Sequence, residues 1–258
     1  MKHNKKFYYN SENDEVLNFK NKPIKIDGNY EYIIRNPLKK FLSWLTYYFI
    51  AVPFAFVTFK LIKRIKFHNK NILKPYKNSG FFIYANHTNQ FCDGFCPGLV
   101  CFPQKAHIII NSANLTTPIV GKFVKMWGGL PLPNTIEATK NFYHAIEDIS
   151  KKNPIIIYPE AHLWPYYTKI RNFPSSSFKY PIKFNKPTFT FTTVYKKRNH
   201  SKKPKIEIYI DGPFSVNKNL DDKFQQEELR NIIHKHLSNR ANLSNCEYIK
   251  YIKRSNHD

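Results

Sequence analysis

The chain has 258 residues, of which 42% are hydrophobic and 16% aromatic, enough to build the core of one large domain. This composition excludes a disordered chain, and the four cysteines lack the spacing of a disulfide framework. Its 41 lysines and arginines against 18 acids give a formal charge of +23, which favours anionic partners such as acidic lipids, phosphorylated substrates or nucleic acid. Lysines that merely solvate the surface would give the same charge.

The first 30 residues are polar and irregular, and residues 10–15 are typical of a loop. The run "FLSWLTYYFIAVPFAFVTF" at 41–59 has no charged residue and is flanked by basic residues on both sides. Its length is close to the roughly 20 residues that a membrane-spanning helix needs. Pro53 in its middle, its aromatic content and its basic flanks favour a helix lying in the plane of an anionic leaflet. A single span and a buried core helix remain as alternatives.

From residue 80 onward, strand-like and helix-like segments alternate. Short continuous apolar runs predict buried strands at 80–85, 106–110 and 154–159. Helical patterns follow at 117–127 and at 135–152, where Asn134 or Thr135 is expected to cap the helix.

Two further strands, at 188–195 and 205–212, and a closing helix near 220–238 complete the pattern. We therefore expect an α/β fold whose central, mostly parallel sheet is flanked by helices. The predicted organisation is an N-terminal region at 1–66, containing an apolar membrane-associating helix at about 41–62, followed by a domain at 67–258.

Two suggestive stretches fall where predicted strands end. In α/β domains, ligands gather at the carboxyl ends of the strands. His87 follows the first predicted strand of the alternating region, and Glu160 follows the strand at 154–159. A histidine can take a proton from a hydroxyl, and a carboxylate on its other ring nitrogen fixes its tautomer, so His87 and Asp93 form a candidate pair.

Three blocks in this order resemble those of the glycerolipid acyltransferases of the lysophosphatidate (1-acylglycerol-3-phosphate) acyltransferase type. They are "NHTNQFCD", "IIIYPEA" some seventy residues later, and "KPTFTFTTVY". The resemblance covers roughly residues 78–212 and implies a glycerol-3-phosphate acyltransferase-like fold. It also implies transfer of an acyl group from acyl-CoA or acyl carrier protein to a lipid hydroxyl. Neither a metal nor a resident cofactor is implied.

Residue by residue, the resemblance implies that His87 is the general base and Asp93 its partner. Asn86 and Glu160 match positions associated with the substrate, Glu160 with holding the acceptor. The chemistry would be direct transfer, in which fixing donor and acceptor side by side removes much of the entropic barrier.

The chain departs from the family at three points. Five residues separate His87 from Asp93, where the family usually has four, and on a continuous helix the extra residue would rotate Asp93 by about 100°. Pro and Asn stand where the second block normally ends in an arginine that grips the acceptor phosphate. Ala161, His162 and Leu163 replace the usual Gly-Thr-Arg after the glutamate.

With both expected arginines missing, Arg171, Lys169 and Lys140 are the candidate replacement cations for a phosphate. The acceptor therefore stays open between a lysophospholipid, a glycolipid and another membrane-borne alcohol.

The sequence thus predicts a phospholipid-biosynthesis type of acyltransferase on the cytoplasmic face of a membrane, peripheral or single-pass. Its expected partners are an acyl thioester donor, a lipid acceptor and an anionic membrane surface. The alternative is a non-catalytic, basic membrane- or nucleic-acid-binding protein on a degenerate acyltransferase fold. No recognised nucleic-acid motif is present, so nucleic acid is not an expected partner.

Overall fold

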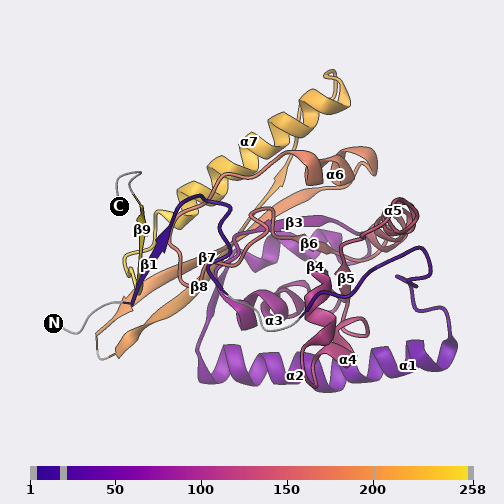
Figure 1. Cartoon of the computed structure of the whole chain (residues 1–258), viewed down its shortest axis with the longest axis horizontal. Helices are drawn as coiled ribbons and strands as arrows, with labels where there is room; N and C mark the ends of the chain where they lie inside the picture. Colours follow the sequence, from indigo (N-terminus) through magenta and orange to yellow (C-terminus); the bar gives the residue numbers. More distant parts are fainter. Residues whose placement is uncertain (1–4, 18–21, 200, 255–258) are drawn as a thin grey trace.

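The computed structural model describes residues 5–17, 22–199 and 201–254, and its centre is a seven-stranded sheet (Figure 1). The strand order is β2-β8-β7-β3-β6-β4-β5, and every neighbouring pair is parallel except β7 and β8. The strands are β2 (Lys66–His68), β3 (Phe82–Ala85), β4 (His107–Ile110), β5 (Gly129–Pro131), β6 (Ile155–Ile157), β7 (Thr188–Arg198) and β8 (Ser201–Phe214). The predicted α/β class with a mostly parallel central sheet is confirmed.

Helices cover both faces of this sheet (Figure 1). They are α1 (Pro37–Thr46), α2 (Val52–Ala55), α3 (Gln90–Cys101), α4 (Gly121–Val124), α5 (Ile136–Ser150), α6 (Lys179–Lys183) and α7 (Asp222–Ala241). Short 3-10 turns lie at Lys70–Tyr76, Ser112–Thr116 and Ser176–Phe178. Thr135 caps α5, as expected, by accepting a hydrogen bond from the Ala138 amide.

Successive side chains of β3 point to opposite faces of the sheet, and each face carries one half of the core. Ile83 and Ala85 face the half built with α2 and α3, whereas Phe82 and Tyr84 face the half built with α5 and α7. Because both faces are buried, the strand is apolar throughout, which explains why its sequence shows no polar alternation.

A continuous apolar helix, Pro37–Ile62, runs along one edge of the molecule (Figure 1). It consists of α1, a π-helical turn at Tyr47–Ala51, α2 and a second π-helical stretch at Phe56–Ile62. Its buried residues recur every four positions: Ser43, Tyr47, Ala51, Ala55 and Phe59. Because this stripe packs along the domain, the helix lies against the domain instead of projecting away from it.

The remaining faces of that helix are apolar and exposed. Large side chains on them include Leu38, Phe41, Trp44, Phe49, Ile50, Phe54, Val57, Leu61 and Ile62. The helix is long and apolar enough to cross a membrane.

Two segments depart from the sequence prediction. Between 117 and 127 only Gly121–Val124 is helical, and Ile119 has a positive φ of 64° that interrupts the expected helix. The apolar spacing there arises because Val120, Val124 and Trp127 line a cavity.

The N-terminal stretch is not wholly irregular. Strand β1 (Lys5–Tyr9) pairs in parallel with β9 (Ile249–Lys253) in a separate two-stranded ribbon. Trp164, which is fully buried, stacks on Tyr251 of this ribbon at 5.0 Å and contacts Tyr9 at 4.8 Å between ring centroids.

Candidate active site

His87 lies in the loop that leaves β3 at the carboxyl edge of the sheet. The preceding residue fixes this loop to β7: the Asn86 amide donates to the Thr193 carbonyl at 3.0 Å and accepts from the Thr193 N–H at 2.8 Å. Thr88 adds a second tie, since the Tyr195 hydroxyl donates to its carbonyl at 3.0 Å. Both polar ends of Asn86 are therefore occupied by backbone, and its side chain is buried. Asn86 was expected to bind substrate, whereas the structure uses it to hold the loop.

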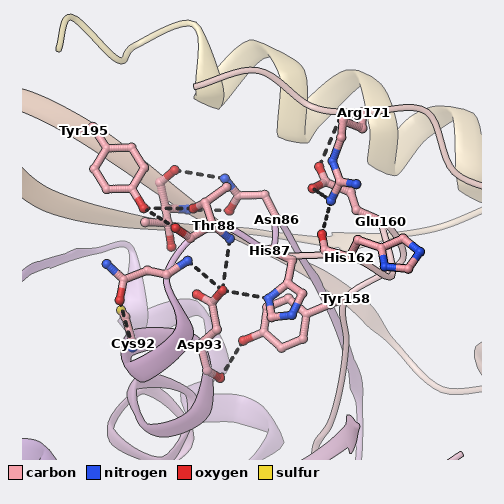
Figure 2. A network of polar contacts seen from close by, with 12 residues as sticks. Asn86, His87, Thr88, Cys92, Asp93, Tyr158, Glu160, His162, Arg171 and Tyr195 are labelled. Atoms are coloured by element: carbon pink, nitrogen blue, oxygen red, sulfur yellow. Dashed lines mark hydrogen bonds and ion pairs between the residues drawn. The ribbon is translucent and has the colours of Figure 1, made fainter. Parts of the chain in front are cut away.

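His87 and Asp93 contact each other directly (Figure 2). The distance from Nδ1 of His87 to Oδ2 of Asp93 is 2.8 Å. The extra residue between them is absorbed by the loop, because Asn89 caps α3 and the helix begins only at Gln90. Asp93 then lies in the first turn of α3, on the side that faces His87. With Nδ1 donating to the carboxylate, Nε2 is the ring nitrogen left to accept a proton.

The Asp93 carboxylate is almost completely buried, with 2% of the side chain exposed. Its Oδ2 also accepts hydrogen bonds from the backbone N–H groups of Thr88 and Asn89, at 3.0 and 2.9 Å. Burial raises the pKa of Asp93, and the hydrogen bond from His87 opposes that rise. Three donors on one buried oxygen fix the carboxylate and, through it, the orientation of the imidazole.

Tyr158 completes the surroundings of the imidazole and was not selected from the sequence as a site residue. Its ring lies 4.6 Å from that of His87 between centroids, and its hydroxyl donates to the Asp93 backbone carbonyl at 2.7 Å (Figure 2). Tyr158 directly follows β6, so the available signal in the sequence was its position at the carboxyl end of a predicted strand.

A cavity of about 790 Å³ opens beside His87, and both members of the pair line it. One part is apolar, between the long helix and α3. Its lining residues include Ala51, Val52, Ala55, Gly94, Phe95, Gly98 and Trp127. A Cβ added at Gly94 would meet no atom within 4 Å, so this glycine leaves free space beside the helix. The 23% exposed His87 side chain is thus accessible from a space that suits an alkyl chain.

The other part of the cavity is polar. Glu15, Asn111, Asn114, His162, Ser177 and Lys179 line it. His162, which replaces the threonine expected from the resemblance, contributes its imidazole to this lining.

Glu160 and Arg171 form a buried ion pair with each other, 3.1 Å apart, and neither is among the described residues that line the cavity (Figure 2). Arg171 also donates to the carbonyls of Glu12 and His162, and its guanidinium lies 4.8 Å from the Trp164 ring centroid. Burial raises the pKa of Glu160, and the charge of Arg171 opposes that rise. The structure brings these two predicted site residues together, and their ion pair joins the two ends of the 160–171 segment.

The other candidate phosphate ligands also lie away from the cavity. Lys169 and Lys140 are exposed and are not among its described lining residues. Asn134, at the position of the family's arginine, pairs with Ile26: its side-chain oxygen accepts from the Ile26 N–H at 2.8 Å, and its own N–H donates to the Ile26 carbonyl at 3.0 Å. These two hydrogen bonds hold the N-terminal segment at Ile26 against Asn134.

No protein-family model matches the chain, and no curated protein matches it in sequence. Among solved structures, it is similar to the 1-acyl-sn-glycerophosphate (LPA) acyltransferase, PlsC, from Thermotoga maritima. The two share 16% identity with a TM-score of 0.51, over 82% of this chain and 97% of PlsC. At this identity the similarity establishes the fold alone, and the predicted acyltransferase-like arrangement of sheet and helices is confirmed at that level.

Proposed function

We propose that this protein transfers a fatty acyl group from an acyl thioester to a hydroxyl of a lipid acceptor, with His87 as the general base and Asp93 as its orienting partner. The observation that carries the proposal is that this hydrogen-bonded pair lines a cavity whose wall also contains apolar side chains of the long helix and α3 and polar side chains such as Asn111 and Asn114. An acyl chain fits the apolar part, and an acceptor head fits the polar part, so that both reacting groups meet at His87.

The step needs no covalent intermediate on the enzyme. Nε2 of His87 takes the proton of the acceptor hydroxyl as its oxygen attacks the thioester carbonyl carbon. The tetrahedral adduct then collapses, the C–S bond breaks, and the imidazolium returns the proton to the leaving thiolate. The products are an ester and a free thiol, and the buried Asp93 carboxylate stabilises the imidazolium in between.

Membrane association is part of the proposal. The exposed apolar faces of Pro37–Ile62 would lie in the interfacial region of a bilayer, with Trp44 at headgroup depth. Lys39, Lys40 and Lys60 near its ends supply attraction to an anionic, cytoplasmic leaflet. Because the buried stripe of the helix packs along the domain, an in-plane placement fits better than a span.

The test is transfer of a radiolabelled acyl group from acyl-CoA and from acyl carrier protein to a total lipid extract. His87→Ala is expected to lower transfer at least about 100-fold, the usual contribution of a general base. His144→Ala is the matched control, since His144 is an exposed histidine on α5 whose side chain is 61% exposed. Circular dichroism and thermal unfolding establish that both variants fold. Equal activity in His87→Ala and the parent protein would refute the mechanism.

A further inference from the structure

The polar part of the cavity is rich in groups that both donate and accept hydrogen bonds. Asn111, Asn114, Ser177 and Glu15 line it. Oδ1 of Asn111 accepts from the Ala113 N–H at 2.9 Å and Nδ2 of Asn114 donates to the Asn111 carbonyl at 3.0 Å, so Nδ2 of Asn111 and Oδ1 of Asn114 are the amide atoms left for a ligand. The Oγ of Ser177 is buried and has no hydrogen-bond partner among the described residues. An unpaired buried hydroxyl in a cavity wall calls for a ligand group that can bond to it.

Basic side chains are scarce in the same wall. The chain carries 41 lysines and arginines, yet Lys179 is the one such residue among the described lining residues. The Nζ of Lys179 lies 5.3 Å from the Tyr180 ring centroid. Arg171 is occupied by Glu160, and Asn134 by Ile26. Among the described lining residues, a phosphate leaving water would therefore meet a single lysine and also the acid Glu15, without a bidentate guanidinium partner.

A neighbouring cavity of about 610 Å³ is also lined by polar side chains, and Pro174 lines both cavities. It contains two acids, Glu12 and Glu227. Its arginine, Arg230, is occupied, since Nε donates to the Phe173 carbonyl and Nη1 to the Asn231 side chain, both at 2.9 Å. The carboxylates of this cavity would accept hydrogen bonds from hydroxyls.

We infer that the acceptor carries an uncharged, hydroxyl-rich head, such as the sugar of a glycosylated monoacylglycerol, instead of a phosphate monoester. The inference rests on the proposed acyl transfer and specifies its substrate class. Sugar hydroxyls both donate and accept, so they satisfy the Asn111 and Asn114 amides, the Ser177 hydroxyl and the Glu15 carboxylate together. A site built to bond hydroxyls discriminates strongly against a head that leaves those groups unpaired.

The experiment compares two acceptors that share one oleoyl chain and differ only in the head: 1-oleoyl-3-glucosylglycerol and 1-oleoylglycerol 3-phosphate. Both are presented to the full-length protein in neutral detergent micelles with a constant fraction of phosphatidylglycerol, so that recruitment by the basic surface is equal. Each acceptor is assayed with oleoyl-CoA and with oleoyl acyl carrier protein. We expect kcat/KM for the glucosyl acceptor to exceed that for the phosphate by at least tenfold.

Variants locate the preference in the cavity wall. Ser177→Ala and Glu15→Gln are expected to raise KM for the glucosyl acceptor severalfold with little change in kcat, whereas Lys140→Gln, an exposed lysine outside the cavity, serves as the control. The inference would be overturned if the phosphate acceptor reacted faster than the glucosyl acceptor and Lys179→Met abolished that preference. The proposed acyl transfer would still stand. Transfer to neither acceptor by folded protein that still acylates a component of the total lipid extract would overturn the acceptor assignment alone. Absence of transfer to the extract as well would overturn the proposed function.

Discussion

Replacing Asp93 by asparagine separates the charge of the carboxylate from its geometry. Three donors converge on Oδ2, namely Nδ1 of His87 and the N–H groups of Thr88 and Asn89. In Asp93→Asn the amide oxygen must take that position, because an amide nitrogen there would face three donors. The imidazole thus keeps its tautomer and orientation, and the variant loses only the negative charge that stabilises the imidazolium.

The kinetic magnitude follows from one charge-assisted hydrogen bond. Such a bond contributes about 1.5–3 kcal/mol, and each 1.4 kcal/mol corresponds to roughly a tenfold rate change, so kcat should fall about 10- to 100-fold. This is less than the loss expected for His87→Ala.

Stability should respond differently from activity. Because burial raises the folded-state pKa of Asp93, its contribution to stability is present at low pH and is lost as pH rises through that pKa. At pH 7 the asparagine variant no longer buries a negative charge, which favours folding. Its amide nitrogen, however, takes the place of Oδ1, an atom that has no hydrogen-bond partner among the described residues. Leaving that N–H group buried without an acceptor costs about 1–3 kcal/mol. These effects oppose each other, so we expect little change in the free energy of unfolding at pH 7.

The assay measures kcat at saturating donor and acceptor, together with urea unfolding, for the parent, Asp93→Asn, His87→Ala and the double variant. The double variant should be no slower than His87→Ala, because Asp93 acts through the imidazole. Parent-like kcat in folded Asp93→Asn, or additive losses in the double variant, would refute the reasoning.

Three further outcomes follow from the structure. Burial, with Lys105 as a second cause, lowers the pKa of His107 to about 3, so its stabilising contribution is present above about pH 6.5 and is lost toward pH 3; urea unfolding should show the parent losing stability relative to His107→Leu over this range. Gly94→Leu should fold normally, because leucine is favoured over glycine in a helix by about 1 kcal/mol, yet transfer of hexadecanoyl groups should fall more than that of octanoyl groups; equal loss for both would place the acyl chain elsewhere. Glu160→Ala leaves Arg171 buried without its partner and should lower the free energy of unfolding by about 3–5 kcal/mol, with Glu160→Met/Arg171→Met recovering most of it; an undiminished unfolding free energy with a raised acceptor KM would instead indicate acceptor binding by Glu160.

Local patterns in the sequence sufficed for the central sheet and for the loop that carries His87. The apolar runs at 80–85, 106–110 and 154–159 correspond to β3, β4 and β6, and the predicted helix at 135–152 corresponds to α5. Each of these elements is specified by residues close together in the chain. β3 and β6 are buried as predicted, whereas β4 is only half-buried because Ile108, Ile109 and Ile110 line the cavity. The contact between His87 and Asp93 also depends on local geometry, because α3 begins after Asn89 and Asp93 therefore lies in its first turn.

Features that depend on distant partners were not predictable in this way. Strand β1 is a short, largely exposed KKFYY segment, and its hydrogen-bonding partner β9 lies more than 230 residues later in the chain. The pairing of Glu160 with Arg171 bridges an irregular segment, for which no spacing rule exists. Asn86 carries the right chemistry for a ligand contact, and only the register of β3 against β7 shows that backbone groups already occupy it.

The pairing of β1 with β9 imposes an order on biogenesis. At a synthesis rate of about 5–20 residues per second, the ribosome needs on the order of 10 to 50 seconds after β1 emerges to deliver β9. During that interval the apolar helix Pro37–Ile62 is already available to reach a bilayer, whereas the segment that carries Glu15 has no ribbon to anchor it. The apolar helix is therefore available for contacts before the ribbon of β1 and β9 can form and fix the segment that carries Glu15.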